Sequence, residues 1–183
     1  MTRYQEIDPA TLDDGQRKIW DEIAAGPRGS VPPPLQIWLK SPELAEKAQL
    51  LGAFARFGSS LPPRLSELAI LCTARFWNAQ YEWHHHEIFA RKAGLGDDVI
   101  AAIAERRTPH FVKEDEKAVY EFCTVFYRDK AVDDATYAQA KAQLGERGVV
   151  DLIGIMGYYG LISVTLNVFA VPVPPGARVP LRD

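Results

Sequence analysis

Apolar residues along this chain recur mostly three and four positions apart, and almost no stretch alternates between apolar and polar residues. A repeat of that length places apolar side chains on one face of an α-helix, whereas a half-buried strand needs strict alternation. Glycine and proline separate the apolar stretches and so mark the helix ends. The pattern predicts an all-α fold of about seven to eight helices in a single domain.

Capping residues and prolines set the expected helix ends. The expected helices cover residues 11 or 13 to 25, 41–58, 65–75, 79–93, 96–106, 114–128, 133–144 and 149–170. A proline-rich connection, 26–34, follows the first helix. Asn78 is expected to be the N-cap of the helix that ends at Gly94. The helix over 41–58 is expected to have an apolar side made of Leu44, Leu50, Leu51, Phe54 and Phe57.

The last expected helix, 149–170, is apolar nearly all round, which predicts a central, buried position. Three of its glycines lie three residues apart; since glycine weakens a helix interior, they indicate a groove where another helix or a ligand comes close. The proline-rich end of the chain cannot continue the helix. We therefore expect an N-terminal helix with its proline-rich connection (1–40), a helical domain (41–171) and an extended C-terminal arm (172–183), which is suited to wrapping a neighbouring subunit.

Composition and charge indicate which kinds of partner to expect. Hydrophobic residues make up 47% and charged residues 25% of the chain, and the net charge is only -3, so charge gives no reason to expect nucleic acid or an anionic membrane. The N-terminus has no apolar signal core, and no apolar run is long enough to span a membrane. We expect a cytoplasmic protein. Its two cysteines, Cys72 and Cys123, lie far apart in sequence and provide neither a disulfide framework nor a CxxC pair, although single-thiol chemistry stays possible.

Three of the four histidines stand side by side in "YEWHHHEIFARKAGL", residues 81–95. On a helix, Glu82 and His86 share a face, whereas His84 and His85 point in other directions. Histidine titrates near neutrality, and a carboxylate one turn away fixes its tautomer and raises its basicity, so this pair suits acid–base chemistry. A pair at this spacing also forms ordinary surface ion pairs. It offers two metal ligands, but no spacing indicates a third, so we expect no metal.

Around these residues the sequence resembles the carboxymuconolactone decarboxylase family, which includes the AhpD-like alkylhydroperoxidases. The segment "LPPRLSELAIL" is similar to the family's LP-x-R-x-x-E-L-A-I-L, and "NAQYEWHHHEIFARKAGLGDDVI" is similar to its Y-E-W-x-x-H-x-x-x-A-x-x-A-G-L. The likeness covers most of residues 44–171. It implies an AhpD-like orthogonal helical bundle that needs no cofactor and assembles as a homotrimer or homohexamer.

The resemblance also separates two branches of that family. The thiol peroxidase branch carries a glutamate, eleven residues, a cysteine, two residues, a second cysteine, three residues and a histidine. Counted from Glu67, these positions fall on Ala79, Glu82 and His86, so both redox cysteines are absent and their disulfide cycle is removed. Cys72 stands where relatives often carry arginine, and we expect it to be packed and inert. The decarboxylase branch uses no thiol and keeps a glutamate just before the histidine.

The resemblance therefore implies a lyase that decarboxylates a small carboxylated lactone or a related intermediate of aromatic compound catabolism. The expected catalytic residues are Glu82, His86 and Glu67. The expected residues for binding a small carboxylate substrate are Arg64, Arg75, Asn78, Tyr81, His85 and Asn167. Aromatic residues such as Tyr158 and Tyr159 line a pocket or belong to the core. Two alternatives stay open: an alkylhydroperoxidase with peroxiredoxin-type antioxidant activity, and a non-catalytic oligomeric protein that binds a small ligand.

Overall fold

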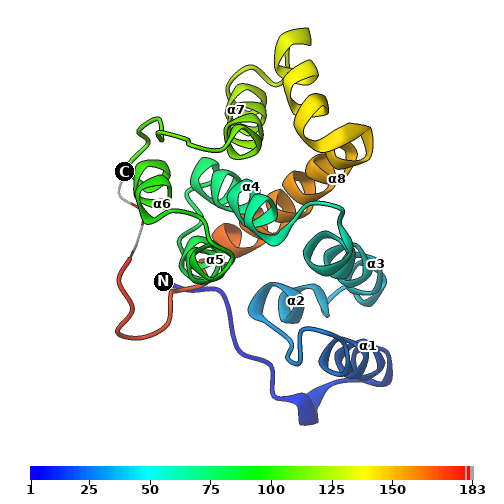
Figure 1. The fold of residues 1–183 in the computed structure, drawn as a ribbon. Coiled ribbons are helices and arrows are strands. Elements are labelled where there is room, and N and C mark those ends of the chain that lie inside the picture. Colours follow the sequence, from blue (N-terminus) through cyan, green and yellow to red (C-terminus); the bar gives the residue numbers. More distant parts are fainter. Residues whose placement is uncertain (180, 182–183) are drawn as a thin grey trace.

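The computed structural model describes residues 1–179 and 181, and the regular structure in this part of the chain is entirely helical (Figure 1). A 3₁₀ turn (Pro9–Thr11) and a short π-helix (Phe54–Gly58) accompany the α-helices. These are α1 (Asp14–Ala25), α2 (Pro33–Trp38), α3 (Pro42–Ala53), α4 (Pro63–Phe76), α5 (Gln80–Lys92), α6 (Asp97–Ala104), α7 (Glu114–Asp129) and α8 (Asp134–Val168). The expected all-α fold is confirmed.

Helix ends follow capping chemistry at several expected positions. Asp13 and Gln16 form a reciprocal capping box at the start of α1. Gly145 interrupts α8 with φ 72° and ψ 170°, a conformation that favours glycine, at the point where one helix was expected to stop. The expectation that Asn78 caps α5 is wrong. Asn78 adopts φ 52° in the turn before the helix, and Ala79 holds the cap position without a side-chain hydrogen bond.

Two helices form the centre of the protein. α4 is surrounded by α5, α6, α7 and α8 (Figure 1), and every residue from Leu65 to Arg75 is buried, polar residues included. By length and composition α8 is apolar enough to cross a membrane, but 61% of its most apolar stretch is buried inside the protein, and the core helix of a soluble protein passes the same test. The burial expected for residues 149–170 holds for one side of this part of α8. Apolar residues on its other side are 36–64% exposed, namely Val150, Ile153, Leu161, Val164 and Val168.

α3 turns its small residues toward the core. Ala45, Ala48 and Gly52 are buried, and the helix packs against α1, α2 and α8. Gly52 permits a close approach, because a Cβ at this position would lie 2.1 Å from the hydroxyl oxygen of Tyr158. The large apolar residues lie on the outside instead, each between 41% and 58% exposed, namely Leu44, Leu50, Leu51, Phe54 and Phe57. These residues form the apolar side that the sequence predicts, and that side faces outward.

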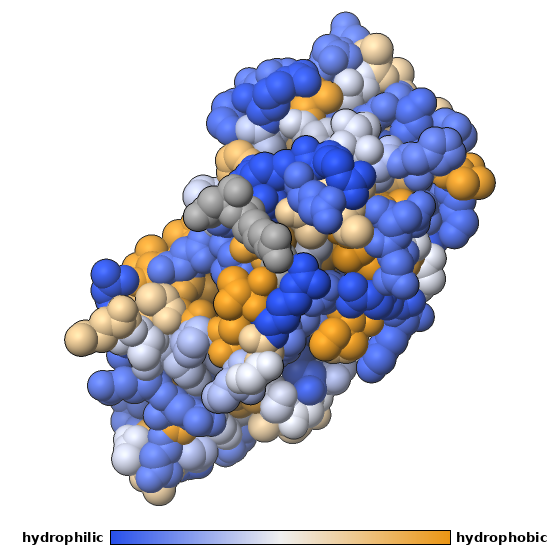
Figure 2. Space-filling view, turned by 90° about the vertical axis from the view of Figure 1, so that its left-hand side faces the viewer, coloured by the Kyte–Doolittle hydropathy of each residue, from blue (hydrophilic) through white to orange (hydrophobic). Residues whose placement is uncertain are grey.

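Both ends of the chain pack on the helical core. Buried Gln36, in α2, accepts hydrogen bonds from the Tyr4 hydroxyl at 3.0 Å and the Ile7 backbone N–H at 3.1 Å; the apolar pattern does not predict this short helix. Residues 172–179 have no helix or strand, and the Gln80 side chain binds the Leu181 backbone at 2.7 and 2.9 Å. Residues 172–179 lie on the left-hand side of Figure 1, and Figure 2 shows this side of the molecule, with apolar surface gathered near its middle. Residues 180 and 182–183 of the expected arm lie outside the described residues.

Candidate active site

Three ionisable side chains meet in the interior between α4 and α5. Nδ1 of His86 lies 2.6 Å from Oε2 of Glu67, in a hydrogen bond, and its Nε2 lies 3.0 Å from Oε1 of Glu82, in an ion pair. Each of the three residues is at most 8% exposed. We call this group the Glu–His–Glu cluster.

Local structure explains how the cluster assembles. Glu82 and His86 are one helical turn apart on α5 and therefore project from the same face. Glu67 comes from the neighbouring α4, which packs along α5. A buried carboxylate is costly unless an opposite charge and hydrogen bonds accompany it. Here the His86 imidazole lies between the two carboxylates and supplies the opposite charge and an N–H group to each of them.

The two carboxylates control the charge of His86. Burial by itself lowers the pKa of the imidazole, because it penalises the charged form. The negative charges of Glu82 and Glu67, and their hydrogen bonds, outweigh burial and raise the pKa of His86 to about 9. At neutral pH His86 is therefore a buried imidazolium, which holds a proton and stabilises negative charge nearby.

We expect the protein to lose stability as the pH rises from about 6.5 toward about 9. The pKa of His86 is about 9 in the folded protein, against 6.5 for an unperturbed histidine, so the folded state binds this proton more tightly. That stabilisation is complete below pH 6.5 and disappears as the pH passes the folded-state pKa. Thermal unfolding of the wild type across this range measures the effect, and a His84→Ala variant should show the same slope. A melting temperature that stays constant from pH 6.5 to 9 would contradict it.

The cluster faces a cavity of about 60 Å³. Its walls come from the proline-rich connection and α2, from the π-helix after α3, from α5 and from α8. The lining residues are Arg28, Pro32, Pro34, Leu35, Arg56, Glu82, His85, His86, Tyr158, Tyr159 and Ile162. Pockets for organic ligands usually measure several hundred Å³. A ligand of that size therefore requires at least one of these walls to move.

Tyr159 brings an unpaired hydroxyl group to this cavity. Its ring packs edge-on against His86, with 5.0 Å between the ring centroids. The residue is 2% exposed, and its hydroxyl has no hydrogen-bond partner. Burial, together with the negative charge of Glu82, raises the pKa of the phenol well above its usual value. Tyr159 is therefore a neutral donor that has no acceptor in the unliganded protein, which is unusual for a buried polar group.

Two arginines give the cavity positive charge. The Arg28 guanidinium lies 3.5 Å from the hydroxyl oxygen of Tyr158. Arg56 packs over the ring of Phe89, 4.5 Å from its centroid. Neither guanidinium forms an ion pair with the described residues, so both remain available to an anion. The sequence pattern does not single out either arginine, because one lies in an irregular connection and the other in a π-helix.

The structure places most of the expected substrate-binding residues elsewhere. Arg64 forms ion pairs with Asp115, at 2.7 Å, and with Glu116, at the start of α7. Arg75 donates to the side chain of Asn78 and lines a separate polar cleft between α5 and α6. These three expected residues do not line the cavity at the Glu–His–Glu cluster.

Tyr81 and His85 lie on α5, one turn apart, and Asn167 lies near the end of α8. The rings of Tyr81 and His85 stack with centroids 4.3 Å apart, and only His85 also lines the cavity at the cluster. Burial lowers the pKa of His85, so this ring is neutral at pH 7. Asn167 is exposed and donates to the Trp77 carbonyl at 2.7 Å; with Tyr81 it lines a groove beside the C-terminal arm.

Within the part of the chain that the structure describes, no group of three or more histidine, cysteine, aspartate or glutamate side chains is arranged to hold a metal ion. The ring of His84 instead packs edge-on against His85.

Comparisons with known proteins identify the fold. The sequence matches no family model and no curated protein, but several solved structures are similar. A protein of unknown function from Agrobacterium tumefaciens, described as a candidate antioxidant defence protein AhpD, superposes with a TM-score of 0.66 at 17% identity, covering 75% of this chain and 95% of its own.

The debrominase Bmp8 is similar over more of the chain. Its unliganded form has a TM-score of 0.70 at 14% identity, with 94% of this chain and 91% of that one covered. A cysteine-to-alanine variant in complex with 2,3,4-tribromopyrrole has a TM-score of 0.70 at 15% identity, with 94% and 90% covered. At these identities the likeness establishes the fold alone. The chain has the AhpD-like helical fold, with a buried Glu–His–Glu cluster beside a cationic cavity.

Proposed function

We propose that this protein is a cofactor-free acid–base enzyme of the cytoplasm, a lyase that decarboxylates a small carboxylated lactone or a related acid of aromatic compound catabolism. The observation that carries the proposal is the buried Glu–His–Glu cluster, whose imidazolium faces a cavity with two guanidinium groups that form no ion pair with the described residues. A small ring also occupies the same fold in Bmp8, as the tribromopyrrole complex indicates.

The chemistry needs an acceptor for negative charge and then a proton. When the carbon–carboxylate bond breaks, CO2 leaves, and the electron pair of that bond flows through the conjugated C=C bond into the lactone carbonyl to give a dienolate. The His86 imidazolium and the Tyr159 hydroxyl supply positive charge and a hydrogen bond for that oxygen. A proton then passes from His86 Nε2 to Glu82, which contacts Nε2 and lines the cavity, and from the Glu82 carboxyl group to carbon.

Arg28 and Arg56 are suited to holding carboxylates of the substrate. A guanidinium binds a carboxylate through two parallel hydrogen bonds and keeps its charge at any physiological pH. We assign these two arginines the binding role expected from sequence for Arg64 and Arg75, because they line the cavity at the cluster. Arg28 lies in the proline-rich connection and Arg56 in the π-helix, so the two guanidinium groups reach the cavity from different walls.

The decisive test is CO2 release from 4-carboxymuconolactone by purified wild-type protein in the presence of a chelator. We expect the wild type and His84→Ala to release CO2, and His86→Ala to release none. Circular dichroism verifies that each variant is folded. Release that persists in a folded His86→Ala variant would overturn the catalytic assignment. Binding of the lactone without release would favour the non-catalytic binding protein, and neither binding nor release would reject the substrate class.

We also propose that the protein assembles as a homotrimer or homohexamer. Apolar side chains of α3 and α8 are exposed in the single chain. Between α7 and α8 lies an apolar groove of about 610 Å³, lined by Gly157 and Gly160 among others, and exposed apolar surface of this kind can mark a contact between subunits. Light scattering should give a multiple of the 20.4 kDa chain mass; the mass of one chain would contradict the assembly.

A further inference from the structure

Phe57, in the π-helix after α3, contacts both arginines of the cavity at the Glu–His–Glu cluster. The Cζ atom of Arg28 lies 5.8 Å from the centroid of the Phe57 ring, and the Cζ atom of Arg56 lies 5.4 Å from it. Both distances are within the range of a cation–π interaction, in which the face of an aromatic ring attracts a positive charge. One ring therefore holds two guanidinium groups that come from different parts of the chain.

Few other contacts fix these guanidinium groups. Arg28 lies 3.5 Å from the hydroxyl oxygen of Tyr158, and Arg56 lies 4.5 Å from the centroid of the Phe89 ring. Neither arginine forms an ion pair with the described residues, and two like charges that line one cavity repel each other. The ring of Phe57 is thus the contact that the two arginines share.

Phe57 contributes little to the hydrophobic core. The residue is 50% exposed, whereas Ala55, in the same π-helix, is 1% exposed and belongs to the core. A side chain that stays half in water gains little free energy from burial. The π-helix is itself a rare element that occurs frequently at functional sites. Here it places Arg56 in the wall of the cavity and Phe57 against Arg56, outside the lining.

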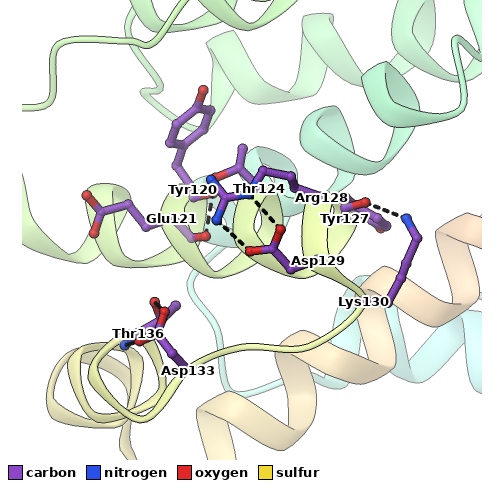
Figure 3. Close-up of polar contacts among 9 residues, drawn as sticks. All are labelled: Tyr120, Glu121, Thr124, Tyr127, Arg128, Asp129, Lys130, Asp133 and Thr136. Atoms are coloured by element: carbon purple, nitrogen blue, oxygen red, sulfur yellow. Dashed lines mark hydrogen bonds and ion pairs between the residues drawn. The ribbon is translucent and has the colours of Figure 1, made fainter.

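Another cation that contacts a ring in this chain has a structural role. The Nζ atom of Lys130 lies 4.7 Å from the centroid of the Phe76 ring and also donates to the Tyr127 carbonyl at the end of α7 (Figure 3). A lysine at this place satisfies a helix carbonyl and suits the negative end of the helix dipole. No carbonyl or carboxylate group of the described residues accepts a hydrogen bond from the guanidinium groups at Phe57.

We infer that Phe57 is a positioning residue, which holds Arg28 and Arg56 in place for the anionic groups of the ligand in the cavity. The inference rests on the proposed function for the identity of that ligand. A mobile arginine side chain loses rotamer freedom when an anion binds it, and this loss weakens binding. The Phe57 ring restricts both side chains before the ligand arrives, so less freedom is lost on binding.

The test compares Phe57→Leu with the wild type in two measurements. The first is calorimetric titration with glutarate, a dicarboxylate that has no lactone ring to react. We expect Phe57→Leu to bind glutarate about tenfold more weakly, because two arginine side chains are then immobilised only on binding. The second is CO2 release from 4-carboxymuconolactone, in which KM should rise by a similar factor while kcat stays nearly unchanged. Phe57→Tyr keeps the aromatic face and should behave as the wild type in both measurements.

Phe54→Leu is the matched control, because Phe54 belongs to the same π-helix and is 41% exposed but has no cation–π contact with either arginine. It should bind glutarate as tightly as the wild type does. Leucine keeps an apolar side chain for contacts between subunits, and light scattering verifies that both leucine variants retain the wild-type mass.

The possible outcomes separate this inference from the proposed function. Glutarate binding that depends on Phe57 without any CO2 release would reject decarboxylation and support the positioning role. Equal glutarate affinities of Phe57→Leu and the wild type would overturn the inference, as would an equal loss of affinity in Phe54→Leu. Absence of glutarate binding by the wild type would overturn it as well, because the two arginines would then not be held ready for an anion.

Discussion

Replacing His86 by alanine is expected to lower the free energy of unfolding at pH 7 by about 3–5 kcal/mol, the usual loss when one partner of a buried charge pair is removed. The imidazolium is the partner that both Glu67 and Glu82 contact, at 2.6 and 3.0 Å. Without it, two buried carboxylates face each other and repel. Each carboxylate then has to be protonated or hydrated, which lowers the free energy of unfolding.

Urea unfolding at pH 7 measures this loss, with two comparisons. His84→Ala, on the same helix but outside the cluster, should change stability by less than about 0.5 kcal/mol. Adding Glu67→Gln and Glu82→Gln to His86→Ala should restore part of the loss, because the unpaired charges are then gone. If His86→Ala is as stable as the wild type, the cluster is not the charged arrangement described above.

Much of the fold follows from local signals in the sequence. The capping box at Asp13, the glycine break at Gly145 and the uniform apolarity after it are short-range features, and the structure has all three. Asn78 shows the limit of such signals: the residue suits an N-cap and a left-handed turn equally well, and the packing of α4 against α5 selects the turn.

The orientation of α3 could not be predicted from hydrophobicity. The helix lies so close to α8 that Gly52 meets the Tyr158 hydroxyl, and only small residues fit along that contact. The large apolar residues are consequently exposed on the other side of the helix. A pattern of small residues at Ala45, Ala48 and Gly52 carries this information, but the stronger apolar signal of the leucines and phenylalanines obscures it. Arg56 follows Gly52 by one turn and lines the cavity at the Glu–His–Glu cluster.

The sequence predicts the Glu–His–Glu cluster of the candidate site, but not the arginines that line the cavity beside it. The spacing of Glu82 and His86 on one helix brings them together, and the family pattern adds Glu67; the structure places all three in contact. Arg64 is held by acidic residues at the start of α7, a long-range contact with no signal in the sequence. Arg28 reaches the cavity because the proline-rich connection folds over it, which no helical periodicity predicts.

Tyr159→Phe is expected to lower the turnover number for decarboxylation by about 10²–10³-fold, the effect of removing one oxyanion donor, while leaving stability nearly unchanged. The hydroxyl is buried without a partner in the unliganded protein. Its removal therefore breaks no native hydrogen bond and relieves the cost of an unsatisfied buried group. In the dienolate it has an acceptor, so its contribution is made in the transition state and lowers kcat.

The matched control is Tyr158→Phe, since the Tyr158 hydroxyl lines the same cavity but lies 3.5 Å from the Arg28 guanidinium as an acceptor. We expect this variant to change KM through the position of Arg28 and to change kcat much less. CO2 release measured over a range of lactone concentrations separates the two effects, and urea unfolding verifies that both variants remain folded. Equal kcat values for Tyr159→Phe and the wild type would remove Tyr159 from the mechanism, because an unpaired donor that stabilises the dienolate has no other way to act than through that rate.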